Sequence, residues 1–110
     1  MSLRFVVLAG LVALVAGCAV AAGGAPRMTV SDYYAFCSAL PTPGACLSDP
    51  ICLRYGKELS SPPADLTGCL AMCRETYNAL YVDNLMNGCA DTLERAWDLC
   101  DQFCRRHDKP

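Results

Sequence analysis

Apolar side chains recur with helical spacing over much of the chain, most clearly in its second half. Over residues 66–81 they return every three or four positions, which predicts one face of an amphipathic helix that Asp65 can cap. A second face of the same kind runs over residues 89–104. The Asn87-Gly88 pair between them is a strong turn signal, so the pattern predicts an antiparallel helical hairpin.

Two shorter helices are expected before the hairpin. Ser31 can cap a helix over residues 32–40, and Ser48 can cap a second one. The proline-containing stretches 41–44 and 60–63 end these two helices. Because no stretch has the alternation of a strand, the sequence predicts an all-α domain: a small disulfide-stapled bundle of about four helices that ends in the hairpin.

The N-terminal segment departs from this pattern. Arg4 gives a positively charged start, and no charged residue occurs between positions 5 and 25. A short charged start followed by an apolar run of this kind is typical of a signal peptide. The run ends in Val15-Ala16-Gly17-Cys18, which resembles the lipobox of bacterial lipoproteins, although that family prefers Leu where Val15 stands.

The resemblance implies how the chain is processed and anchored. In bacterial lipoproteins the cysteine thiol receives a diacylglyceryl group and the signal peptide is cut before it. This implies a signal peptide over residues 1–17, a lipidated Cys18 with a flexible tether over 18–28, and a disulfide-rich helical domain over 29–107. The implied partner is a membrane, and the implied location is the cell envelope, at the outer membrane or periplasmic face in a Gram-negative cell.

Two other fates of the N-terminal segment stay open. An ordinary signal peptidase could cut after Ala21 or a nearby alanine and release a soluble protein. Alternatively, the uncharged stretch 5–25 is long enough to remain as an uncleaved anchor. All three alternatives place the domain outside the cytoplasm.

The cysteine count fits an exported chain. The sequence has nine cysteines, and an odd number needs an explanation that lipidation of Cys18 would supply. The remaining eight predict four disulfides in a short exported domain, and they are Cys37, Cys46, Cys52, Cys69, Cys73, Cys89, Cys100 and Cys104.

Two of the four pairings follow from the hairpin. Each hairpin helix carries a Cys-x3-Cys pair on its apolar face, and folding the chain back at residues 87–88 brings Cys73 opposite Cys100 and Cys69 opposite Cys104. The pairing of the other four cysteines stays open, with Cys46 or Cys37 favoured as the partner of Cys89. Over residues 65–107 the motif resembles the twin Cys-x3-Cys hairpin of the small Tim chaperones and of plant antimicrobial hairpins, a resemblance that implies geometry and no function.

Charge and residue types argue against catalysis and nucleic-acid binding. The formal net charge is −2 and no basic cluster occurs, so no nucleic acid is expected as a partner. The single histidine, His107, lies near the C-terminus, and no phosphate-binding loop or Cys-x-x-Cys redox motif is present. We therefore expect no enzyme activity, no cofactor and no catalytic residue.

The last helix carries an acidic outer side that is expected to be a solvated face. Asp91 and Asp101 stand four residues before Arg95 and Arg105, a spacing that predicts ion pairs along the helix. Trp97, on the apolar stripe, is expected in the core.

The leading hypothesis for function is a membrane-anchored lipoprotein with a non-enzymatic binding or envelope-structural role toward an unknown protein or small molecule. One alternative is a soluble secreted effector or inhibitor. Another is a Cu(I)-binding bundle lined by cysteine thiolates, because the chain resembles exported copper-storage four-helix bundles in size and in its Cys-x3-Cys motif. The four-disulfide interpretation leaves no metal ligands among the eight cysteines.

Overall fold

Four α-helices follow one another in the computed structural model, which describes residues 26–107. They are α2 (Val30–Ser38), α3 (Asp49–Leu59), α4 (Leu66–Tyr81) and α5 (Ala90–His107), and a short 3-10 turn, η1 (Val82–Asn84), continues α4. This confirms the predicted all-α fold of four helices. The signal peptide, Cys18 and most of the tether lie outside the described residues.

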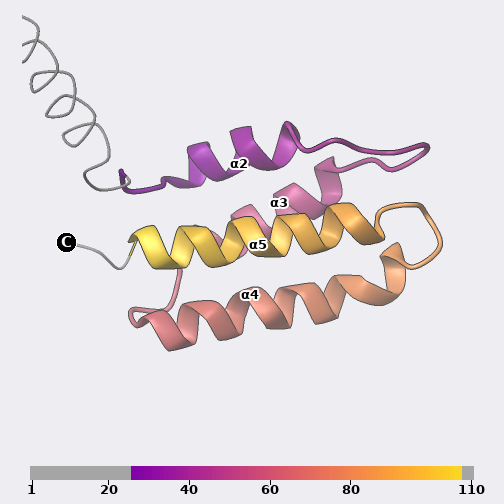
Figure 1. The fold of residues 1–110 in the computed structure, drawn as a ribbon. Helices are drawn as coiled ribbons and strands as arrows, with labels where there is room; N and C mark the ends of the chain where they lie inside the picture. The colour runs from indigo at the N-terminus through magenta and orange to yellow at the C-terminus, as the bar shows by residue number, and fades with distance from the viewer. Residues whose placement is uncertain (1–25, 108–110) are drawn as a thin grey trace, which may run out of the picture.

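Successive helices run in opposite directions, so that each one is antiparallel to the next (Figure 1). The most extensive packing is between α4 and α5, and α5 also contacts α2 and α3. The hairpin that the sequence predicts is therefore the larger part of the bundle. Its turn contains Gly88, whose φ of 82° lies in the left-handed region that favours glycine.

The start of α2 differs from the expectation. Thr29, and not Ser31, caps this helix: its hydroxyl accepts a hydrogen bond from the Asp32 amide at 3.1 Å, and the Asp32 carboxylate accepts one from the Thr29 amide at 2.9 Å. These two bonds form a capping box and lower the pKa of Asp32. The prediction failed because Ser31 offers no such reciprocal pair, whereas Thr29 has a carboxylate three residues on.

The caps of the next two helices agree better with the sequence. Ser48 occupies the N-cap position of α3, although its side chain makes no capping hydrogen bond, and Pro50 lies in the first turn. Asp65 caps α4 as predicted, because its carboxylate accepts from the Gly68 amide at 3.3 Å. At the other end of α2, the helix stops at Ser38 rather than at residue 40.

Four disulfides cross-link the bundle, and all eight of their cysteines are buried, at 5% exposure or less. Two of them join α4 to α5 in the arrangement that the hairpin predicts, one joins α2 to α3, and one joins the loop before α3 to the residue before α5. With their Cα–Cα distances, they are Cys69–Cys104 (5.7 Å), Cys73–Cys100 (5.8 Å), Cys37–Cys52 (5.8 Å) and Cys46–Cys89 (5.0 Å). Of the two partners favoured for Cys89, the structure therefore selects Cys46.

The rest of the core is built from a few large side chains. Tyr33 and Tyr55 are fully buried and lie next to one another, with their ring centroids 6.2 Å apart. The Tyr33 hydroxyl donates a hydrogen bond to the Ala96 carbonyl of α5 at 3.0 Å, whereas the Tyr55 hydroxyl is buried without a hydrogen-bond partner. Burial raises the pKa of both phenols well above the ordinary value.

These two tyrosines provide a matched test of the core. Tyr33→Phe removes a bond between α2 and α5 and is expected to lower the free energy of unfolding by about 1 kcal/mol. Tyr55→Phe is expected to leave that free energy unchanged or to raise it, because the lost hydroxyl is desolvated without a partner. Denaturant unfolding of the two variants checks this, and a larger loss for Tyr55→Phe than for Tyr33→Phe would contradict the packing described.

Candidate functional site

The structure describes all but one of the residues singled out from the sequence. Cys18, the proposed lipidation site, lies outside the described residues. The other eight cysteines are all in disulfides, so in the oxidised protein none of them is a thiolate. Within residues 26–107, no group of three or more histidine, cysteine or carboxylate side chains is arranged to hold a metal ion.

His107 lies in the last turn of α5. Its ring stacks on that of Phe103 one turn earlier, with the centroids 5.2 Å apart and the planes 12° from parallel. The histidine is exposed, and the phenylalanine below it is buried. This contact gives the single histidine of the chain a packing role at the end of the helix.

The acidic side of α5 is only partly the solvated face that was expected. Asp91 forms the predicted ion pair with Arg95, at 2.9 Å. Asp101 forms no such pair with Arg105, and its Oδ1 atom is buried without a hydrogen-bond partner. Burial raises the pKa of the Asp101 carboxyl despite the opposing influence of Arg105 and of the Trp97 indole N–H, which comes near without reaching hydrogen-bond geometry.

Asp101 and Trp97 lie in a groove between α4 and α5. Trp97 was expected in the core, but it is only half-buried and stacks on Tyr77 of α4, with the ring centroids 4.5 Å apart. The groove has a volume of about 350 Å³, and the residues that line it are Thr67, Leu70, Ala71, Arg74, Trp97, Asp101 and Arg105. Its two cations stand beside a carboxylate, so the groove has no uniform charge with which to select a ligand.

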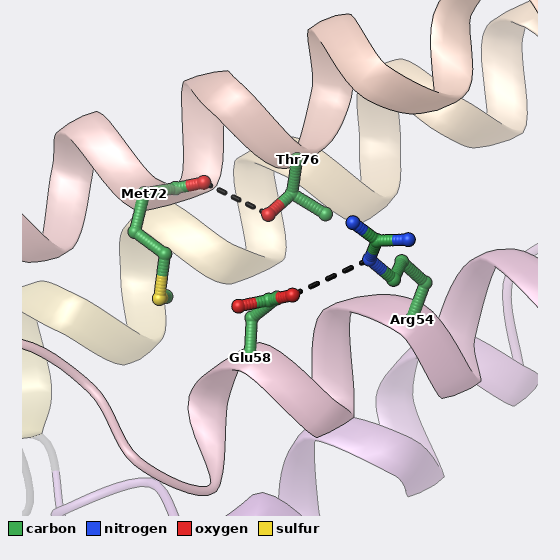
Figure 2. Close-up of polar contacts among 4 residues, drawn as sticks. All are labelled: Arg54, Glu58, Met72 and Thr76. Atoms are coloured by element: carbon green, nitrogen blue, oxygen red, sulfur yellow. Dashed lines mark hydrogen bonds and ion pairs between the residues drawn. The ribbon is translucent and has the colours of Figure 1, made fainter.

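A second groove lies along the surface where α3 packs against α4. Figure 2 shows polar side chains from both helices that line it. On its α3 side, Arg54 pairs with Glu58 at 3.3 Å. On its α4 side, the Thr76 hydroxyl donates to the Met72 carbonyl at 2.9 Å. The groove measures about 270 Å³. The two polar contacts lie within single helices, and the remaining charged residue of the lining is the exposed Glu75, so the groove presents no convergent set of groups.

The α2–α3 and α4–α5 loops lie at the same end of the bundle (Figure 1). Residues of both loops line a third hollow there. We define this end, residues 39–51 and 80–91, as the tip. The hollow measures about 370 Å³ and is lined by five apolar and three polar residues: Ala45, Leu47, Pro50, Ile51, Leu80, Asp83, Asn84 and Asn87. The Cys46–Cys89 disulfide joins its two sides.

Large apolar side chains project from the tip into solvent. Met86 is 96% exposed, Leu47 77% and Val82 74%, and two further exposed members are Tyr81 and Leu85. The helical periodicity over residues 66–81 predicted that Tyr81, its last member, would be buried, and no pattern singled out the other four. A signal was present, because residues 81, 82, 85 and 86 keep helical spacing past the end of the buried stripe, although the helical structure itself ends at Asn84.

The tip also differs in charge from the rest of the domain. It carries the carboxylates of Asp49, Asp83 and Asp91, and it contains no lysine, arginine or histidine. The opposite end is where residue 26, the α3–α4 connection and the end of α5 lie together (Figure 1). The cations near that end are Arg27, Lys57, Arg105 and Arg106.

Comparison with known proteins leaves this site without a relative to interpret it. No family model matches the chain. No curated protein and no solved structure matches it either. The resemblances to the lipobox and to the twin Cys-x3-Cys hairpin therefore depend on the motif residues alone, and the functional argument depends on the geometry of the domain.

The partly buried carboxylate of Asp101 is expected to make the stability of the fold depend on pH. Its pKa is raised in the folded state, so ionisation disfavours folding at neutral pH, and this penalty disappears as the pH falls and the group is protonated in both states. Asp101→Asn is therefore expected to raise the melting temperature at pH 7, with a gain that shrinks below the raised pKa. Glu94→Gln, at an exposed position of the same helix, is the matched control in thermal unfolding followed by circular dichroism. A loss of stability in Asp101→Asn at pH 7 would contradict this account.

Proposed function

We propose that this chain is an extracytoplasmic lipoprotein, held at a membrane through Cys18, whose rigid helical domain has a non-enzymatic binding role. The observation that carries the proposal is the pairing of the cysteines. All eight cysteines of the described domain are taken up in buried disulfides, which fits an oxidising compartment outside the cytoplasm. Cys18 is then the odd cysteine, and it stands at the last position of a lipobox-like motif.

The shape of the domain supports a role that depends on anchoring at one end. Residue 26, where the described chain begins, lies at the end of the bundle opposite the tip (Figure 1). The helices between the two ends are long: α5 has 18 residues, or about 27 Å at 1.5 Å per residue. A tether attached at residue 26 therefore leaves the exposed apolar tip free to point away from the membrane.

The tip favours binding over a purely structural role. Exposed side chains as large as Met86, Val82 and Leu47 cost solubility, and a soluble domain of this size has no packing reason to keep them together at one end. The disulfide beneath them holds the two loops in one arrangement, which reduces the entropy lost on binding. Within residues 26–107 no helix is long and apolar enough to cross a bilayer.

A test of the proposal is the fate of Cys18. In the wild-type protein, the intact mass is expected to correspond to a chain that begins at Cys18 and carries acyl groups, and the protein is expected to stay with membranes after an alkaline wash. Cys18→Ala is expected to abolish acylation, because it removes the thiol that receives the lipid. Val15→Leu, which brings the motif closer to the family pattern, is the control and is expected to keep both properties.

Two outcomes would contradict the proposal. A soluble mature protein without acyl groups would support the secreted effector or inhibitor. A membrane-bound protein that retains residues 1–17 and lacks acyl groups would support the uncleaved anchor.

A further inference from the structure

We propose that the tip binds a cationic amphipathic segment of a partner protein, one in which leucine- or phenylalanine-like side chains lie beside lysine or arginine. This deepens the proposed function, because it depends on the domain being a binding module and names the chemistry of its partner. The inference combines an apolar surface, a hollow beside it and an unbalanced negative charge, all within the tip.

The apolar contribution comes from one short segment, formed by the end of α4, η1 and the bend that follows. Over residues 80–87 the chain has two sides with different tasks. One side presents Tyr81, Val82, Leu85 and Met86 to solvent, and the other side lines the hollow with Leu80, Asp83, Asn84 and Asn87. The exposed surface and the hollow are thus adjacent, and a bound segment could cover the first while one of its side chains enters the second.

The hollow suits a side chain that is apolar along its length and positively charged at its end. The residues that line it include the apolar Ile51, Leu80 and Leu47 and the exposed Asp83. Lysine and arginine bury their methylene groups against apolar surface while the charged group stays at the rim. The two asparagines of the lining are already engaged, because Asn84 donates to the Leu80 carbonyl at 2.7 Å and Asn87 donates to Asn84 at 2.9 Å. This leaves Asp83 as the charged group of the hollow.

Asp83 has no structural role that accounts for it. Asp49 and Asp91 lie in the first turns of α3 and α5, where a carboxylate complements the helix dipole, and Asp91 also pairs with Arg95. Asp83 instead lies in η1, which continues the C-terminal end of α4, where the dipole disfavours a negative charge. Among the described residues it forms no ion pair. A cation from a partner would pair with the Asp83 carboxylate and offset its unfavourable interaction with the helix dipole.

The same charges argue against two other occupants. Two copies of the domain meeting tip to tip would bring together Asp49 and Asp83 of each copy, four carboxylates that form no ion pair among the described residues. An anionic lipid surface would be repelled for the same reason. A partner segment with lysine or arginine at the edge of an apolar face satisfies both the apolar and the charged parts of the tip.

The experiment uses the full-length mature protein in nanodiscs of zwitterionic lipid and a synthetic helical peptide as the probe. The peptide has about 18 residues, long enough to form a helix, with leucine along one face and lysine on the other. Binding is measured by titration calorimetry at low and at high salt. We expect saturable binding of one peptide per protein that weakens as salt rises, since surface charges are screened.

Variants separate the two contributions. Val82→Asn combined with Met86→Gln is expected to weaken binding by about tenfold or more, because two apolar side chains that the bound peptide would bury are lost from the contact. Asp83→Asn is expected to weaken it by about two- to fivefold at low salt and to leave high-salt binding unchanged. Leu53→Gln, at an exposed apolar position in the middle of α3, and Glu75→Gln, an exposed carboxylate on α4, are the matched controls and are expected to bind as the wild type does.

Several results would overturn the inference. One is that a leucine–glutamate peptide binds as well as the leucine–lysine peptide. Another is that the tip variants bind as well as the control variants. A third is that the peptide binds nanodiscs without the protein as well as nanodiscs that carry it. Self-association of the protein that the Val82 and Met86 changes abolish would identify a second copy as the occupant instead. The anchoring proposal is tested independently: acylated Cys18 with no peptide binding rejects only this inference, and peptide binding by a soluble, unacylated protein rejects only the anchoring.

Discussion

Four buried disulfides are the constraint on which the rest of this structure depends. The described domain has 82 residues, and a chain of that length buries too little apolar surface to have a wide margin of stability. The bridges join all four helices, since α4 is tied to α5, α2 is tied to α3, and Cys46–Cys89 links these two pairs. In a loop-entropy model this last bridge, with a separation of 43 residues, stabilises the fold by about 4 kcal/mol.

The position of that bridge connects stability with the candidate site. Cys46–Cys89 lies beneath the two loops of the tip, so the same bond that closes the longest loop also holds the exposed apolar surface in place. The described chain begins at the other end of the bundle (Figure 1), and Cys18 precedes it in the sequence. The proposed attachment and the proposed binding surface are therefore at opposite ends of the domain.

The hairpin was predictable because its signals are local and repeated. Two Cys-x3-Cys pairs and the Asn87-Gly88 turn agree on one register, which fixes the pairing of Cys69 and Cys73. The partner of Cys89 stayed open, because the choice between Cys46 and Cys37 depends on how α2 and α3 pack on the hairpin. The tip was missed for a related reason: periodicity assigned Tyr81 to the buried face, and only the packing shows that the bundle ends before this residue.

Disulfide mapping of the native protein by mass spectrometry without reduction tests this framework most directly. Met72 and Asp101 offer cleavage points between the two cysteines of each hairpin helix, by cyanogen bromide and by a protease that cuts before aspartate. The structure predicts linked fragments for Cys37–Cys52, Cys46–Cys89, Cys69–Cys104 and Cys73–Cys100, with none of these eight cysteines as a free thiol. A free thiol among them, or a bridge from Cys69 to Cys100, would contradict it.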